Sequence, residues 1–520
     1  MTKILAAVPL ITTISTAAIL TNAAVANAQD SADLRRALDE IERLKQSNAA
    51  LAEKVGALEE RVAEGNDAGW LTEQRAAEVR AIVTDVLADA GTRTSLADGA
   101  TAGYDAKKGF FLASADGNYT LQMKGETQIR WAYSARDIGA ETAAQGSPSA
   151  STDEDAWGFE IRRMRMTFFG TVVDPSWYYE VKFEFARSGG AATLSDAFVE
   201  KRFENGFNLR VGQFKGPFLR ESIDSATGLL AVERSLVDTF FTVGRPQGMR
   251  LAWESDVVRI EGFYGSELAA VGSAPYSIVS GSASELNAGA ALGIPGSQNS
   301  GFNAVQTDYA FIGRIEAKTG GEWKQFKDMQ SFRGEEAAAL FGVGAYAQQV
   351  DPVSGTDGAT ADVMWSVTAD ARVDFGGASI FVYGVYRDVS LQEAQPVRGG
   401  GDSDELQQWG AVAQGGYFVT DDIEAFLRYE IGNSDTDKFR TAPGTLDAEG
   451  EELSLVTVGA NWWPAGVKNR IKISGDFGYA FSPIVDFAAS GADWLPDYTA
   501  ENGGTSDGEW VIRTQLQLTF

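Results

Sequence analysis

The sequence predicts an all-β protein, a transmembrane antiparallel up-and-down β-barrel of about 16 strands, preceded by an α-helical coiled coil. Two observations predict the barrel. Segments of about ten residues or more alternate apolar and polar side chains, and short turns alternate with long polar loops. A heptad repeat near the N-terminus predicts the coiled coil. We expect the barrel to occupy residues 104–520.

Residues 1–28 are expected to be a cleaved signal peptide. Lys3 supplies a positive charge, an apolar stretch follows from Ile4 to Leu20, and the small residues Ala26–Ala28 form a cleavage site. A membrane anchor is the alternative, but Pro9 and many Thr and Ser residues weaken it, and no basic stop-transfer cluster follows. The sequence therefore predicts an exported protein.

Residues 29–64 are expected to form a periplasmic coiled coil, because apolar residues recur at two seam positions of a heptad and charged residues flank them. The apolar seam consists of Leu34, Ala37, Ile41, Leu44, Leu51, Val55, Leu58 and Val62. Asn48 within the seam is typical of a residue that sets the register, and the seam composition favours two strands. Residues 65–103 are expected to hold a second helix and a linker.

From residue 104 onward the alternation has a period of two, as in the segment Tyr119–Tyr133. A soluble sandwich would also alternate, but its strands usually run only about five or six residues. Aromatic residues near the ends of the apolar faces, as at Trp131 and Trp462-Trp463, are typical of membrane-interface girdles. The last strand ends on Phe520, a feature that resembles the signal recognised during outer-membrane barrel assembly.

The composition excludes most catalytic classes. The chain has no Cys and no His, so it lacks disulfides, thiolate nucleophiles and a histidine general base. Gly504–Gly508 matches the nucleophile-elbow pattern, but it lies in a polar, Gly-rich stretch with no histidine to activate Ser506, and we interpret it as a loop. We therefore expect no enzyme, no catalytic residue, no metal site and no cofactor.

The charge balance bears on the partners. A net charge of −28 makes binding to nucleic acid unfavourable. The acidic runs Asp153–Asp155 and Asp402–Glu405 could bridge divalent cations to lipopolysaccharide, but they lack the spacing of a calcium loop. Solvated loop charge is the favoured interpretation of both runs.

Several motifs resemble the phosphate-selective porin O/P family over roughly residues 109–520, without the coiled coil. They are Arg162–Arg165, Val211–Phe218, Glu221-Ser222, Glu233–Ser235, Gly244–Gly248 and Gly459–Trp463. The resemblance implies a homotrimer of sixteen-stranded barrels, each narrowed by an inward-folded third loop at about residues 215–248. This trimer conflicts with the two-stranded preference of the coiled-coil seam, and the conflict stays open.

The resemblance also places the family's constriction arginines on Arg162, Arg163 and Arg234, and we expect Arg220 and Lys215 to contribute less. Arginine stays charged and offers planar donors to oxyanions, so a ring of arginines favours anions. Adjacent Arg162 and Arg163 cannot both face the lumen of a regular strand, so one needs a bulge. The alternative is that one of them is a rim or salt-bridged residue.

Two departures from the family pattern weaken dedicated phosphate transport: Ser222 stands where a basic residue is expected, and Glu126 stands where an arginine is expected. The predicted function is therefore passive diffusion of small hydrophilic solutes and ions through a cell outer membrane, with a modest preference for anions. The alternative is a structural protein whose coiled coil tethers the membrane to peptidoglycan. The expected partners are the lipid bilayer, lipopolysaccharide, further copies of the chain and small anions.

Overall fold

A computed structural model of the chain describes residues 100–105, 109–137, 153–187, 189–265, 307–350, 361–397, 401–435, 452–466, 470–482, 484, 487, 494 and 508–520. The chain forms two compact units, Met1–Arg93 and Thr94–Phe520. The predicted signal peptide, coiled coil and second helix lie outside the described residues, as does nearly all of the Gly504–Gly508 stretch.

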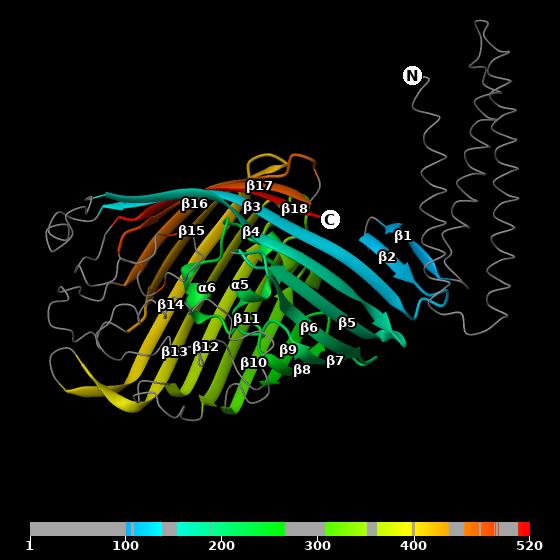
Figure 1. The fold of residues 1–520 in the computed structure, drawn as a ribbon, viewed down its shortest axis with the longest axis horizontal. Helices are drawn as coiled ribbons and strands as arrows, with labels where there is room; N and C mark the ends of the chain where they lie inside the picture. The colour runs from blue at the N-terminus through cyan, green and yellow to red at the C-terminus, as the bar shows by residue number, and fades with distance from the viewer. Residues whose placement is uncertain are drawn as a thin grey trace, which may run out of the picture. The chain divides into compact units, whose positions relative to one another are not determined.

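Sixteen antiparallel strands of the second unit form a closed ring (Figure 1). Each strand pairs with the next along the chain, and the last pairs with the first, which confirms the predicted barrel and strand number. The strands are β3 (Thr120–Asp137), β4 (Asp153–Val172), β5 (Asp174–Phe185), β6 (Ala192–Arg202), β7 (Phe207–Gln213), β8 (Gln247–Glu254), β9 (Val258–Gly265), β10 (Thr307–Thr319), β11 (Ala338–Val350), β12 (Ala361–Asp374), β13 (Ala378–Pro396), β14 (Asp402–Phe418), β15 (Ile423–Asn433), β16 (Leu453–Trp462), β17 (Ile471–Ala480) and β18 (Trp510–Thr519).

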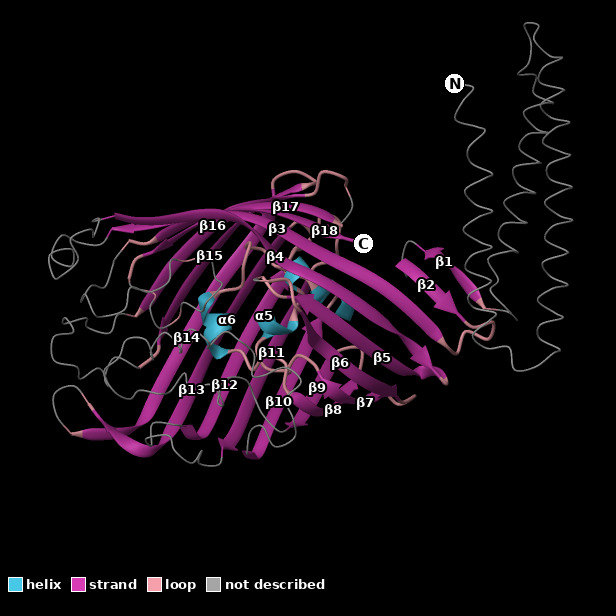
Figure 2. Cartoon of the chain, in the orientation of Figure 1, coloured by secondary structure: helices cyan, strands magenta, loops and turns pink. Residues whose placement is uncertain are grey.

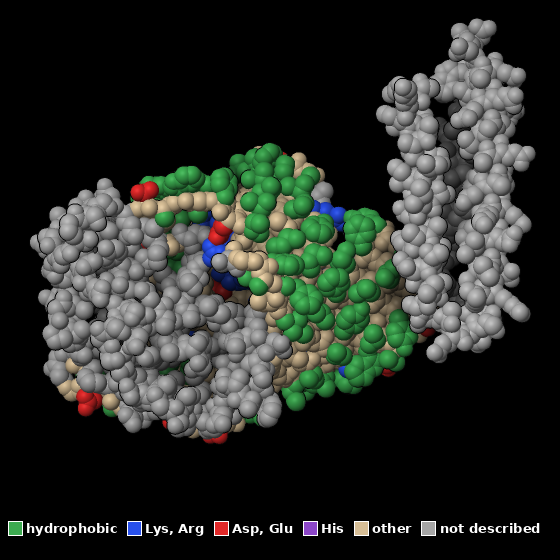
Figure 3. Space-filling view, in the orientation of Figure 1, with side chains coloured by type: hydrophobic (Ala, Val, Ile, Leu, Met, Phe, Trp, Pro, Cys, Tyr) green, Lys and Arg blue, Asp and Glu red, His purple; other side chains and the backbone are tan. Residues whose placement is uncertain are grey.

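The period-two sequence pattern separates the two faces of this wall. On β18, Arg513 and Gln515 are buried inside the barrel, whereas Ile512 and Leu516 on either side of them are exposed on the outside. Apolar side chains cover much of the outer surface of the strands in view (Figure 3). Since ring closure pairs the strands on both edges, the wall presents few unsatisfied backbone groups to lipid. No helix among the described residues is long and apolar enough to cross a membrane.

The ring closes beside the C-terminus. The backbone N–H of Gly125 donates to the carbonyl of Phe520 at 2.7 Å, and the N–H of Phe520 donates back at 3.0 Å. A Cβ on Gly125 would lie 2.2 Å from the Phe520 ring, so this close approach requires glycine. A hairpin of β1 (Thr101–Asp105) and β2 (Gly109–Ala113) precedes the ring, and β2 pairs with the start of β3.

Two of the connections that the structure describes throughout fold into the barrel from opposite ends. Residues 214–246 join β7 to β8 at the end that carries the long loops, and we call them the inward loop. They contain α5 (Arg220–Ile223), the short helix η1 (Ala226–Gly228) and α6 (Leu236–Phe241), which lie within the ring of strands in Figure 2. Residues 320–337 join β10 to β11 at the opposite end, contain η3 (Trp323–Lys327), and are here called the turn insert.

The turn insert departs from the expected pattern of short turns at one end. The other described connections at that end are short, as at residues 203–206, 255–257, 375–377 and 419–422. The insert instead buries Phe332 against Phe418 and Trp463. Trp463 is only 2% exposed, so its predicted place in a membrane-interface girdle is wrong, whereas Trp462 is 43% exposed.

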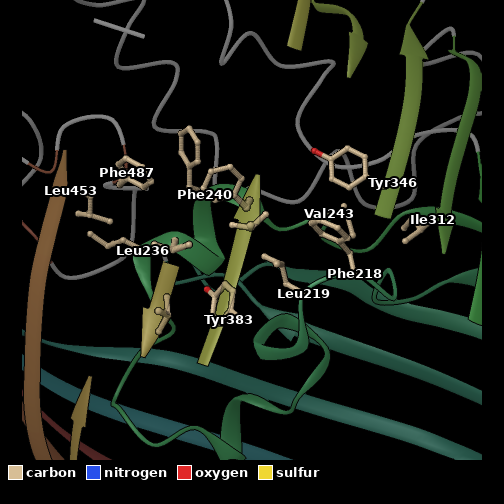
Figure 4. Packing of buried hydrophobic residues seen from close by; sticks show 14 of the residues in the cluster. Phe218, Leu219, Leu236, Phe240, Val243, Ile312, Tyr346, Tyr383, Leu453 and Phe487 are labelled. Carbon is tan, nitrogen blue, oxygen red and sulfur yellow. The ribbon is translucent and has the colours of Figure 1, made fainter. Parts of the chain in front are cut away.

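A hydrophobic core lies inside the barrel, between the inward loop and the wall (Figure 4). Phe218 of the loop packs on Tyr346 of β11 with ring centroids 4.8 Å apart. The labelled loop residues Leu219, Leu236, Phe240 and Val243 belong to the same cluster. One side of the lumen is therefore filled by packed protein.

Candidate pore constriction

The inward loop crosses the lumen because polar contacts hold it to β15–β18 on one side and to β3 and β4 on the other. At its base, the N–H of Gly216 donates to the carbonyl of Gly244 at 3.1 Å, which closes the loop's neck. Ser235 caps α6 by accepting a hydrogen bond from the N–H of Asp238. Polar side chains on β15–β18 then bond to the loop backbone: Leu236 to Glu430, Glu233 to Arg428, Leu230 to Asn461, Leu229 to Lys472, Val232 to Asp476 and Thr227 to Gln517.

Glu233 fixes the middle of the inward loop to β3 and β4. Its carboxylate accepts from Arg130 at 3.0 Å and from Arg162 at 2.8 Å, and it also contacts Arg163. Burial works to raise the pKa of Glu233, but the three guanidinium groups outweigh burial and hold that pKa well below its usual value. The carboxylate is therefore charged at any working pH and clamps the loop.

Arg162 and Arg163 reach the same carboxylate because β4 is bulged between them. Gln128 of β3 pairs with Arg163, and Ile129 pairs with Ile161, so Arg162 is the extra residue. The bulge predicted from the two adjacent arginines is therefore present. Both arginines are salt-bridged to Glu233; the Arg163 side chain is 4% exposed and that of Arg162 is 17% exposed.

The other three candidates sit elsewhere on the inward loop. Arg234 donates to the backbone carbonyl of Asp224 at 2.9 Å and lies 3.5 Å from the carboxylate of Asp238. Arg220 is buried between Asp224 at 2.6 Å and Glu316 of β10 at 3.0 Å. The structure thus brings Arg162 and Arg163 together, and it holds Arg234 and Arg220 in separate contacts.

Lys215 lies at the base of the inward loop, where its Nζ donates to the carbonyl of Asp224 at 2.6 Å. Burial lowers the pKa of Lys215 well below its usual value, and the neighbouring cations Arg234, Arg245 and Lys182 lower it further. Several positive charges therefore crowd this side of the loop. The roles of all five candidates in permeation stay predictions.

The two departures from the family pattern also have structural places. Glu126 faces Arg165 of β4 at 3.5 Å. Ser222 donates to the carboxylate of Asp238 at 2.8 Å. Burial raises the pKa of Asp238 to about 7, and the nearby carboxylate of Glu221 acts in the same direction.

The turn insert braces the inward loop from the other end of the barrel. The N–H of Met329 donates to the carbonyl of Gly228 at 2.7 Å, and the Gln330 side chain donates to the carbonyl of Leu229 at 2.8 Å. A Cβ on Gly228 would lie 2.6 Å from Cβ of Asp328, so the two segments touch closely. The inward loop and the turn insert together fill the lumen on the side of β11–β18.

A cavity of about 1070 Å³ lies below the inward loop, and we call it the basic cavity. Its described lining comes from β2–β10, the inward loop, the turn insert and the residues beside the C-terminus, and includes no residue of β11–β16. Seven carboxylate side chains line it, against eleven basic ones, an excess of four basic side chains. The basic residues are Lys124, Arg165, Lys182, Arg202, Arg210, Lys215, Arg245, Arg250, Arg259, Lys327 and Arg470.

Three of these cations have no carboxylate partner among the described residues: Lys124 on β3, Lys215 on the inward loop and Lys327 on the turn insert. Lys124 and Lys327 are also exposed. By contrast, Arg210 and Arg250 stand opposite each other in the sheet and share Glu200, at 2.6 Å and 3.2 Å. A partly unpaired set of cations around a cavity favours anions.

Among the basic residues of this cavity, only Lys215 was expected at the constriction, and Arg165 was identified only as part of a family motif. Arg202, Arg210, Arg250 and Arg259 lie on successive strands, at positions that the period-two pattern would assign to the lumen if extended through this segment. Their density on four neighbouring strands was the available signal. Lys327 carried no such signal, because its connection was not expected to enter the barrel.

Residues 143–281, which include β4–β9 and the inward loop, match the family described as phosphate-selective porin O and P. This match confirms the resemblance inferred from the motifs over that segment. The chain has the fold and the family signature of an outer-membrane porin. No curated protein matches the chain.

Solved porin structures are similar over most of their length at low sequence identity. The outer membrane channel DcaP of Acinetobacter baumannii is 12% identical, with 76% of this chain and 97% of that chain covered and a TM-score of 0.44. OmpF of Salmonella typhi in complex with daunomycin is 12% identical, with 77% and 98% covered and a TM-score of 0.42. The trimer form of OmpT of Vibrio cholerae is 12% identical, with 77% and 99% covered and a TM-score of 0.40.

Proposed function

We propose that this outer-membrane barrel is a diffusion channel for small hydrophilic solutes with a modest preference for anions. The observation that carries the proposal is the basic cavity, with eleven basic and seven acidic side chains among its described lining residues. Solutes that pass the inward loop on its open side meet this excess of positive charge. In a narrow, partly desolvated space, such charge acts on ions more strongly than it would in bulk water.

The proposal assigns two roles to the basic residues. Arg162 and Arg163 set the shape of the constriction through Glu233, whose charge offsets part of theirs. Arg234, which is partly exposed at the inward loop, contributes positive potential at the narrow part. Lys215 holds the base of the loop through the carbonyl of Asp224, and Arg220 anchors α5 to β10. Most of the anion preference then comes from unpaired cations such as Lys327.

General anion preference fits this chemistry better than dedicated phosphate transport. Glu126 offsets the charge of Arg165, and the residue that contacts Asp238 from position 222 is a neutral serine. The channel is further proposed to assemble as a homotrimer in the outer membrane, with lipid and lipopolysaccharide around its apolar belt and the N-terminal segment in the periplasm. The alternative role as a peptidoglycan tether concerns residues that the structure does not describe.

A reversal-potential measurement in a planar bilayer under a potassium chloride gradient tests this function. The unmodified chain should favour chloride over potassium. Lys327→Gln should lower that preference by roughly twofold, because it removes one unpaired cation from the cavity. Lys324→Gln is the matched control, since Lys324 lies on the same η3 segment, exposed and outside the cavity lining.

A cation-selective unmodified channel would refute the anion preference. Equal effects of the Lys327 and Lys324 substitutions would refute the assignment of that preference to the basic cavity.

A further inference from the structure

An aromatic row runs along the wall of the basic cavity. Phe169 of β4 and Tyr178 of β5 have ring centroids 6.4 Å apart, and Tyr178 lies 6.0 Å from Phe198 of β6. Phe198 in turn meets Phe214, at the start of the inward loop, edge to face at 5.9 Å. All four rings line the cavity, on a face where the barrel otherwise places mostly polar side chains.

Cations lie over the rings of this row. The Nζ of Lys124 is 5.0 Å from the centroid of Phe169, and the guanidinium of Arg202 is 4.6 Å from that of Tyr178. The guanidinium of Arg210 is 3.9 Å from the centroid of Phe198. Rings and positive charges therefore alternate along the wall, within the range of cation–π attraction.

The charged groups are held in place but not neutralised. Glu200 accepts from Arg202 at 2.9 Å and from Arg210 at 2.6 Å, and it also pairs with Arg250. Glu261 also pairs with Arg250 at 3.2 Å, so two carboxylates orient three guanidinium groups and leave one positive charge in excess. The Arg202 side chain is 51% exposed, so its planar face is open to a solute.

We propose that this row binds ring-bearing carboxylates, in particular a single aromatic ring with one carboxylate, during their passage through the channel. The planar ring of the solute stacks on the exposed guanidinium of Arg202 or on Tyr178, where π faces and cations are already arranged. Its carboxylate takes up the excess charge around Glu200, or that of Lys124, which has no carboxylate partner among the described residues. A cavity of about 1070 Å³ is large enough for such a solute.

This proposal deepens the proposed function, because it names a solute class for the same cavity. It differs from charge selectivity in one respect: of two solutes with the same charge, the one with an aromatic ring should bind more tightly. Benzoate and cyclohexanecarboxylate are the matched probes, since both are six-membered-ring monoanions and only benzoate has a π face.

The test is isothermal titration calorimetry on the full chain in detergent, with benzoate, cyclohexanecarboxylate and inorganic phosphate as ligands. Benzoate should bind about five- to tenfold more tightly than cyclohexanecarboxylate, the factor expected for one stacking or cation–π contact. Tyr178→Leu should remove this difference. Tyr178→Phe is the matched control and should keep it, because only the hydroxyl that donates to Glu180 is lost. Arg202→Gln should weaken benzoate binding by a similar factor.

Equal binding of the two ring carboxylates would overturn the proposal, as would unchanged benzoate binding in Tyr178→Leu. Tighter binding of phosphate than of benzoate would also overturn it, in favour of a simple oxyanion site. Reversal potentials in chloride report the proposed function separately, so a channel without anion preference that still distinguishes the two carboxylates would refute only the function.

Discussion

The two sides of the barrel interior use the same kinds of residues in opposite ways. On the side of β11–β18, buried arginines have carboxylate partners on the wall: Arg372 with Asp374 at 2.9 Å and Arg513 with Asp476 at 2.8 Å. On the side of β3–β9, Lys124 has no carboxylate partner among the described residues. The first wall is covered by the inward loop and the turn insert, and the second faces the basic cavity.

The difference shows what charge does in each place. A buried arginine that lost its carboxylate would be strongly destabilising, so the paired arginines help to hold the covered wall together. A cation beside a water-filled cavity keeps much of its hydration and can remain unpaired at little cost. Buried, bonded cations therefore mark the part of the lumen that holds the fold together, and exposed, unpaired cations mark the part that can act on solutes.

The largest expected effect comes from the boundary between the two regions, at Glu233. Glu233→Gln leaves Arg130, Arg162 and Arg163 around a neutral acceptor, and the free energy of unfolding should fall by about 3–5 kcal/mol. Heat-induced unfolding in detergent measures this loss. Single-channel conductance should rise, because the middle of the inward loop loses its tie to β3 and β4.

Glu254→Gln is the matched control for that change. The Glu254 side chain is 42% exposed and, among the described residues, pairs only with Arg259 on the next strand, so its loss should cost less than about 1 kcal/mol. Similar losses of stability in the two variants would contradict the distinction between clamping and solvated ion pairs.

A second, smaller effect should depend on pH, through Asp238 of the inward loop. Its pKa of about 7 lies above that of an unfolded aspartate, so the folded chain binds the proton more tightly. Stability from this group is therefore greatest in acid and is lost as the pH rises through 7. Between pH 6 and pH 8 the free energy of unfolding should fall by about 1.4 kcal/mol.

Unfolding temperatures at the two pH values test this, with Asp238→Asn as the comparison. The variant should lose that part of the pH dependence. An unchanged pH dependence in the variant would show that a group other than Asp238 binds this proton.

The same contrast explains which features could be predicted from the sequence. Period-two alternation is local, so it identified the strands and their lumen face, and the adjacent arginines at 162 and 163 even required the observed bulge. The partner of those arginines is Glu233, about 70 residues away in sequence. Such a pairing depends on ring closure and on the path of the inward loop, which no local pattern encodes.

The turn insert was not predicted from the sequence, for a related reason. Its buried residues Phe326, Met329 and Phe332 have neither a period of two nor a helical period. Their burial depends on contacts with the strands β11–β18 and with the inward loop, such as the hydrogen bond from the N–H of Met329 to the carbonyl of Gly228. The basic cavity beneath them was missed too, because its shape follows from these two segments.

The sharpest test of the comparison comes from one substitution made on each wall, because the two substitutions should have opposite effects on stability and on selectivity. Lys472 of β17 is 2% exposed and its Nζ donates to the carbonyl of Leu229 at 2.9 Å, so Lys472→Gln should cost roughly 2 kcal/mol. Lys124 of β3 is exposed at the basic cavity, so Lys124→Gln should change stability by less than about 0.5 kcal/mol. Reversal potentials should show the opposite order, with a lower chloride preference in Lys124→Gln and little change in Lys472→Gln. If both variants changed stability and selectivity together, charge balance would not separate the structural wall from the conducting one.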